Sequence, residues 1–303
     1  ARFRAAGRRR DEGRALSEVG LVAYARYDYP PAEQAYAEAL AIHRETGDVF
    51  YEAETLNRMG WLKNAQGDPR AALALHEQAL PLRRQAGSLE GEGVTWNDLG
   101  RAHLDLGDVD QAIEALERGL AVRDRDEDPG GAAQVLNRIG MARRAAGEFQ
   151  PALDAFREAI PLARKAGDVR NQGQLLHNVA TVLAQVGEVA ESRRLLEEAL
   201  ALCRGIKFTA CESAALGALG VSYAGTREAR PAREALEKAL AIRVELKDAP
   251  GQASVHRALA EVHLLEGDRE GALASAEEAL RRYRALGGLR LEGIAWSTLA
   301  QVR

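Results

Sequence analysis

The chain has 303 residues with a formal net charge of −4, and its 41 basic and 45 acidic side chains nearly balance. This balance gives no indication of binding to nucleic acid or to a membrane surface. No run of about 18 apolar residues is present and no signal-peptide pattern begins the chain, so a transmembrane span is not expected. Cys203 and Cys211 form neither a disulfide framework nor a zinc pattern. We expect both to be small apolar residues of a cytoplasmic protein.

The first segment, residues 1–10, is basic. Its arginines are Arg2, Arg4, Arg8, Arg9 and Arg10. A nucleic-acid or acidic-lipid contact is one interpretation, but no basic stripe continues along the rest of the chain. We favour the end of a linker from an upstream domain, or the first turns of a capping helix.

A small residue then returns every forty positions along the chain. The register is Gly20, Gly60, Gly100, Gly140, Ala180, Gly220, Ala260 and Ala300. A second register has the same period: Ala32, Ala72, Ala112, Ala152, Ser192, Ala232 and Ala272. A fixed period of this size is typical of a solenoid, in which each repeat packs on its neighbours.

Residues 50–87 represent one repeat, and their apolar side chains recur at steps of three and four in two separate stretches. Gly67-Asp68-Pro69 lies between the stretches, where Gly can end one helix, Asp can cap the next and Pro suits its first turn. Each repeat is therefore predicted to be an antiparallel helix pair. Residues 202–231 depart from the pattern, and Gly225-Thr226-Arg227 is expected to shift the turn and to soften the joint or change the superhelix pitch.

The repeat resembles the tetratricopeptide repeat. The matching residues are Trp96, Leu99-Gly100, Ala112, Leu116 and Gly119-Leu120. The usual period is about 34 residues, and the forty-residue form is similar to repeats of bacterial multidomain regulators and kinesin light chain. The resemblance implies an all-α, right-handed superhelical solenoid over residues 1–303. We expect a single domain of about seven helix pairs, followed by a final helix from about residue 289.

In this family one face of the first helix of each pair lines a concave groove. Transferring that face to this chain gives Asn57, Arg58, Trp61, Asn97, Arg101, Asn137, Arg138, His177 and Asn178. Asn can hydrogen-bond a peptide backbone, Arg can pair with acidic groups, and Trp supplies apolar area. The alternatives are a solvated helix face and Asn residues that bond a neighbouring backbone.

We therefore predict a protein-interaction scaffold that binds a peptide or protein segment in its groove, as the partner-binding or sensor arm of a signalling regulator. A sensor of a small molecule or signalling peptide and a self-assembling scaffold remain alternatives. No phosphate loop, nucleophile elbow or zinc-protease motif occurs, so we expect no enzyme activity, cofactor or metal. His256 and His263 are seven residues apart, but we interpret both as packed imidazoles.

Overall fold

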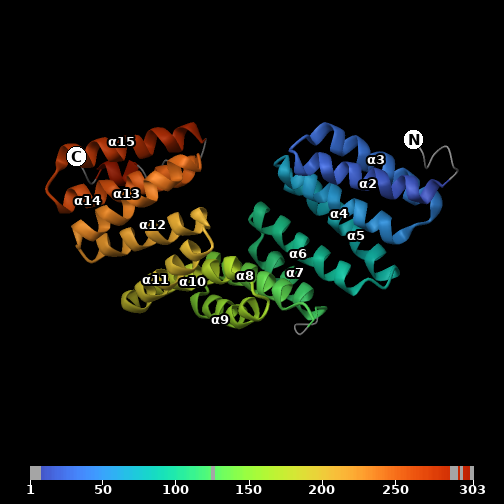
Figure 1. The fold of residues 1–303 in the computed structure, drawn as a ribbon, viewed down its shortest axis with the longest axis horizontal. Helices are drawn as coiled ribbons and strands as arrows, with labels where there is room; N and C mark the ends of the chain where they lie inside the picture. The colour runs from blue at the N-terminus through green and yellow to red at the C-terminus, as the bar shows by residue number, and fades with distance from the viewer. Residues whose placement is uncertain (1–7, 124–126, 287–292, 294–295, 301–303) are drawn as a thin grey trace. The chain divides into compact units, whose positions relative to one another are not determined.

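The structure is a computed structural model, which describes residues 8–123, 127–286, 293 and 296–300. These residues form α-helices in consecutive antiparallel pairs joined by short turns, without any strand among them (Figure 1). The all-α prediction is therefore confirmed. The final helix expected from about residue 289 lies largely outside the described residues. Within them, no helix combines the length and the apolar composition needed to cross a bilayer.

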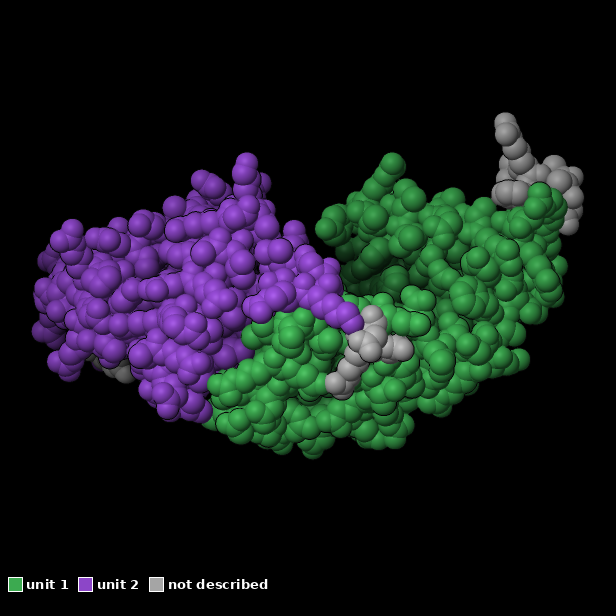
Figure 2. Space-filling model, turned by 60° about the horizontal axis from the view of Figure 1, so that its bottom comes forward, with its two compact units in different colours: residues 1–162 green, residues 163–303 purple. Residues whose placement is uncertain are grey.

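The chain divides into two compact units, residues 1–162 and residues 163–303 (Figure 2). Unit 1 contains α2 (Arg9–Ala25), α3 (Tyr29–Thr46), α4 (Val49–Ala65), α5 (Pro69–Gln85), α6 (Leu89–Leu106), α7 (Val109–Ala121) and α8 (Pro129–Ala145). Helix α9 (Phe149–Lys165) crosses the boundary. Unit 2 contains α10 (Val169–Gln185), α11 (Val189–Gly205), α12 (Thr209–Gly225), α13 (Ala229–Glu245), α14 (Ala249–Leu265) and α15 (Arg269–Ala285).

The described part of the basic first segment packs against the end of α3. Arg9 begins α2 and forms ion pairs with Glu12 and Glu45, each at 2.9 Å. The Arg10 guanidinium donates a 3.1 Å hydrogen bond to the carbonyl of Thr46. These two arginines therefore hold the start of the first described helix on its partner.

The turn between α4 and α5 has the predicted geometry. Gly67 adopts a left-handed φ of 80°, which a residue with a side chain rarely takes. The Asp68 carboxylate accepts a 3.0 Å hydrogen bond from the backbone N–H of Ala71, and Pro69 is the first residue of α5. Gly, Asp and Pro thus end one helix and start the next as the sequence indicates.

The expected shift of the turn at residues 225–227 is wrong. Helix α12 ends at Gly225 and α13 begins at Ala229, the same interval that separates Ala65 from Pro69. Arg227 takes the left-handed conformation with φ of 62°, although it has a side chain. A non-glycine residue pays roughly 1–2 kcal/mol for this conformation, so packing of the flanking helices holds the turn in register.

Close packing within a helix pair requires the small residue of the forty-residue register. In α4, a methyl group built on Gly60 would lie 2.4 Å from Cε1 of the fully buried His76 on α5. That separation is far below van der Waals contact, so the imidazole ring occupies the space that a side chain would need. Gly60 therefore sets the distance between α4 and α5.

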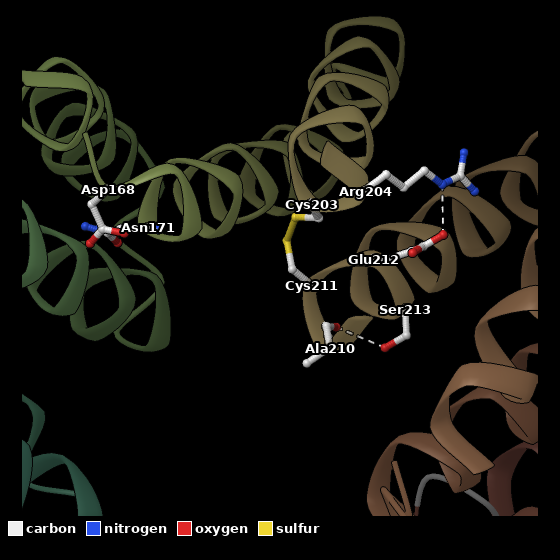
Figure 3. The surroundings of a disulfide bond; sticks show 8 residues. All are labelled: Asp168, Asn171, Cys203, Arg204, Ala210, Cys211, Glu212 and Ser213. Atoms are coloured by element: carbon white, nitrogen blue, oxygen red, sulfur yellow. Dashed lines mark hydrogen bonds and ion pairs between the residues drawn. A yellow bond between two sulfur atoms is a disulfide. The ribbon is translucent and has the colours of Figure 1, made fainter. Parts of the chain in front are cut away.

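Cys203 and Cys211 form a disulfide between α11 and α12, which overturns the expectation of two separate apolar cysteines (Figure 3). The Arg204–Glu212 ion pair, at 2.8 Å, flanks the bond. Forty residues further on, the same two positions are Arg243 and Gly251, and there the arginine side chain lies against the glycine. The disulfide therefore replaces an arginine–glycine contact at the junction of two helix pairs.

Candidate functional site

The first helices of unit 1 form a continuous inner face. Each first helix contacts the first helix of the next pair: α2 contacts α4, α4 contacts α6, and α6 contacts α8. No such contact joins α3, α5 and α7 within the described residues. This difference means that the second helices splay apart on the outer side of the unit. Seven of the predicted site residues are on this inner face: Asn57, Arg58 and Trp61 on α4, Asn97 and Arg101 on α6, and Asn137 and Arg138 on α8.

Asn57 does not present its amide to a partner. The side chain is 1% exposed, and its oxygen accepts hydrogen bonds from His76 Nδ1 at 3.0 Å and from Thr95 Oγ1 at 3.4 Å. Its nitrogen donates to Asp98 Oδ2 at 3.4 Å. These bonds satisfy a buried amide that would otherwise cost free energy, so Asn57 joins α4 to α5 and α6.

Arg58 is also engaged within the unit. Its guanidinium forms ion pairs with Glu54 and, at 2.9 Å, with Glu18, and donates to the carbonyl of Ser17 at 3.2 Å. Two carboxylates therefore neutralise one nearly buried arginine. Its expected role in pairing with acidic groups of a partner does not fit this arrangement.

Asp98 lies at the centre of the inner face and accepts a 2.6 Å hydrogen bond from the indole Nε1 of Trp61. Burial raises the pKa of this carboxyl, and the Trp61 hydrogen bond and the charges of Arg101 and Arg138 act in the opposite direction. Trp61 is half-buried, so one edge of its ring is used to join α4 and α6. We call Asn57, Trp61, Asp98, Arg101 and Arg138 the Asp98 cluster.

Arg101 and Arg138 give this cluster an excess of positive charge. Arg101 Nη2 lies 3.9 Å from Asp98 Oδ1, and neither its Nη2 nor its Nε makes a hydrogen bond in the described part of the chain. Burial lowers the pKa of Arg138, and the nearby Arg101 charge lowers it further. Guanidinium groups stay charged in proteins. Asp98, whose own ionisation burial disfavours, is therefore the buried carboxyl that these two cations share, and the exposed Asp105 also acts on Arg138.

The two asparagines beside these arginines are half-buried. The side-chain oxygen of Asn97 is buried and has no hydrogen-bond partner among the described residues. Asn137 is next to Arg138 on α8, and the exposed Met141 follows one turn later. The α6–α8 part of the inner face therefore combines cations, amides and an apolar side chain.

His177 and Asn178 are on α10 in unit 2 and are both half-buried. His177 borders a hollow of about 440 Å³ within that unit, together with residues of α11, α12, α13 and α14. The sequence interpretation included His177 but not Arg243, a second-helix residue that reaches the same hollow. Likewise it left Asp98 out of the predicted site.

The model of the tetratricopeptide repeat family matches residues 11–85, 92–165 and 171–245, which is most of the chain. No curated protein matches it. A Signal Transduction ATPase with Numerous Domains from Pyrococcus horikoshii, which has a tetratricopeptide repeat sensor, is similar with a TM-score of 0.77 and 16% identity. That similarity covers 95% of this chain and 44% of the other.

Two further solved structures share the fold. Aspartyl phosphate phosphatase F from Bacillus subtilis has a TM-score of 0.73 and 13% identity, over 93% of this chain and 71% of that one. A tetratricopeptide repeat protein from Parabacteroides merdae has a TM-score of 0.67 and 15% identity, over 96% and 99%. The forty-residue period, the helix pairs and the family match agree, and the chain belongs to the tetratricopeptide repeat family.

Proposed function

We propose that the chain is a protein-interaction scaffold and that the α6–α8 part of the inner face of unit 1 binds an extended acidic segment of another protein. The observation that carries the proposal is that Arg101 and Arg138 share one buried carboxyl, Asp98, while the other acid that acts on Arg138, Asp105, is exposed to solvent. Partly desolvated guanidinium groups favour carboxylate partners because charge-assisted hydrogen bonds are stronger there than in open water.

Asn97 and Asn137 support a backbone-binding role in the same place. Both lie on the inner face beside the arginines, and an amide can donate to and accept from an extended peptide. Trp61 adds partly exposed ring surface at the α4 edge. Asn57 and Arg58 are left out of the proposed contact set because their polar groups bond within the unit.

The larger role follows by analogy. The Pyrococcus horikoshii protein has its repeats as a sensor, and this chain spans less than half of its length. On that basis we propose that the chain is the partner-binding or sensor arm of a larger signalling regulator.

The test is a selection of short linear peptides on the full chain, followed by binding measurements on the enriched sequences. We expect enrichment of Asp and Glu, and at least about tenfold weaker binding by the double variant Arg101→Gln, Arg138→Gln. Arg118→Gln is the matched control, because Arg118 is an exposed arginine of α7 that pairs with Glu114 at 2.6 Å. Selected peptides without acidic residues, or equal binding by the double variant with an unchanged melting temperature, would contradict the proposal. Capture from a lysate of the source cells with the same variants then identifies the natural partner.

A further inference from the structure

Unit 2 contains a hollow of about 440 Å³ that is large enough for a small molecule. The first helices α10, α12 and α14 border it, and the second helices α11 and α13 contribute its floor. Most of its lining is aliphatic. The aliphatic residues include Ala180, Leu196, Ala218, Val221, Leu236 and Val255. Val221 is 43% exposed, so an apolar surface continues to the mouth of the hollow.

The hollow exists because α12 has no long side chains where unit 1 has them. In the forty-residue register, Gly217 and Ala218 correspond to Asn57 and Arg58. The side chains of Asn57 and Arg58 fill the inner face of unit 1 with hydrogen bonds and ion pairs. Glycine and alanine leave the equivalent space in unit 2 open.

Arg243 is the one side chain with a permanent charge among the described residues that line this hollow. Its Nη1 donates a 2.7 Å hydrogen bond to the carbonyl of Gly251, and its Nε lies 3.9 Å from Asp248 Oδ2. Its Nη2 lies over Gly217, since a methyl group built there would be 3.2 Å from that atom. The guanidinium is thus fixed from one side and presents its other nitrogen to the hollow.

Nη2 of Arg243 makes no hydrogen bond to any described residue. Burial lowers the pKa of Arg243, which reflects the desolvation of its charge, yet the group stays protonated. The nearest carboxylate, Asp248, is not part of the lining and caps α14 by accepting from Gly251 N–H. An anion in the hollow would therefore meet a cation and no opposing acidic group.

We propose that this hollow binds a small organic carboxylate, whose apolar body contacts the alanine, valine and leucine walls and whose carboxylate accepts a hydrogen bond from Nη2 of Arg243. An inorganic anion would leave the aliphatic walls without a partner, and a neutral apolar molecule would leave the cation without one. The site is independent of the peptide-binding function proposed for unit 1. A small carboxylate, rather than a peptide, fits because the hollow has the volume of a small-molecule site.

The probe is octanoate, titrated into the full chain by isothermal titration calorimetry, with octanamide as its neutral analogue. We expect saturable binding of octanoate and at least about tenfold weaker binding of octanamide. Arg243→Met should weaken octanoate binding to a similar degree. Arg230→Met is the matched control, since Arg230 is an exposed arginine on the same helix that pairs with Glu234 at 3.1 Å.

Ala218→Leu tests the apolar wall without changing Arg243. If Arg243→Met fails to fold, this second variant still tests whether octanoate binds in the hollow. This variant should occupy part of the hollow beside Val221 and weaken octanoate binding, while its melting temperature stays near that of the unchanged chain. Absence of saturable octanoate binding, equal affinity for octanamide, or unaltered binding by Ala218→Leu would each overturn the proposal. Displacement of octanoate by the acidic peptides selected on unit 1 would also overturn it, because the hollow would then belong to the peptide site.

Discussion

The indole of Trp61 donates a 2.6 Å hydrogen bond to the carboxylate of Asp98 and so connects α4 with α6 across the boundary between two repeats. Asp98 is only 6% exposed, and it is shared by Trp61, Asn57 and the more distant Arg101. A repeat array depends on such interfaces between neighbours for its stability. The polar inner face is therefore part of the packing of unit 1 as well as a candidate binding surface.

Asp98 should make the protein less stable as the pH rises. Burial raises the pKa of Asp98 above its ordinary value of 3.8, so the folded state retains its proton more tightly than the unfolded state. The resulting stability is fully present below the unfolded pKa and is lost as the pH rises through the raised pKa. Urea unfolding should be measured at a series of pH values from about 3.8, the ordinary pKa of the carboxyl, upwards. As the pH rises, the unfolding free energy of the unchanged chain should fall relative to that of Asp98→Asn. Parallel pH profiles of the two proteins would show that the charges of Arg101 and Arg138 fully offset the effect of burial on the pKa of Asp98.

His76 should act in the opposite direction. Burial, with a smaller contribution from the charge of Arg101, lowers the pKa of His76 to about 3, so the unfolded state binds the proton first. Stability is present above the unfolded pKa and decreases as the pH falls towards the folded value. Between pH 7 and pH 5 we expect a loss of about 2 kcal/mol from this group.

The measurement is the difference in unfolding free energy between the unchanged chain and His76→Gln at each pH. Subtraction of the two profiles cancels the other titrating groups. The loss on acidification should be absent from the variant. An identical slope in both proteins would mean that His76 binds a proton as readily in the folded state as in the unfolded state.

Gly60→Val should open the contact between α4 and α5. The new side chain would overlap the His76 ring, and such overpacking costs about 1–3 kcal/mol. Gly205→Ala is the control, because nothing lies within 4 Å of a methyl group at that position and alanine favours helix over glycine by up to about 1 kcal/mol. Thermal unfolding should therefore show a lower midpoint for the first variant and an equal or higher one for the second. The opposite order would contradict the close approach of these helices.

The bond between Cys203 and Cys211 should stabilise the α11–α12 junction. It closes a short loop, for which the chain-entropy model gives up to about 2.5 kcal/mol. A reductant should lower the unfolding midpoint of the unchanged chain and leave that of a Cys203→Ala, Cys211→Ala variant unaltered. Mass spectrometry after alkylation without reductant measures the oxidation state directly. Two alkylated cysteines in the native protein would show that the thiols are free.

The helix pairs were predictable because small residues and turn residues repeat with one period. Gly60 and Gly67 have the roles that their residue types indicate, since a close approach and a left-handed turn each exclude most side chains. The turn at Arg227 was predicted wrongly, because an arginine disfavours the left-handed conformation that the packed flanking helices impose there. Local residue preference therefore predicted the element types, and tertiary packing decided the exceptions.

The candidate site was harder to predict, because helix periodicity places a residue on a face but does not reveal what the next repeat places opposite it. Asn57 is on the inner face as expected, yet Asp98 and His76 occupy its hydrogen-bonding groups. One signal was present in the sequence. Asp98 is an acidic residue in the register where Arg58 and Arg138 are basic, and opposite charges at matching positions of neighbouring repeats attract each other.

The Cys203–Cys211 bond also makes one junction mechanically different from the others in unit 2. Where Arg243 lies against Gly251, only side-chain packing and hydrogen bonds resist separation of adjacent hairpins. Under a stretching load, those contacts would yield before a covalent link breaks. Full extension of this unit would then stop short by residues 204–210, which the bond encloses, and reduction of the bond would release that length of chain.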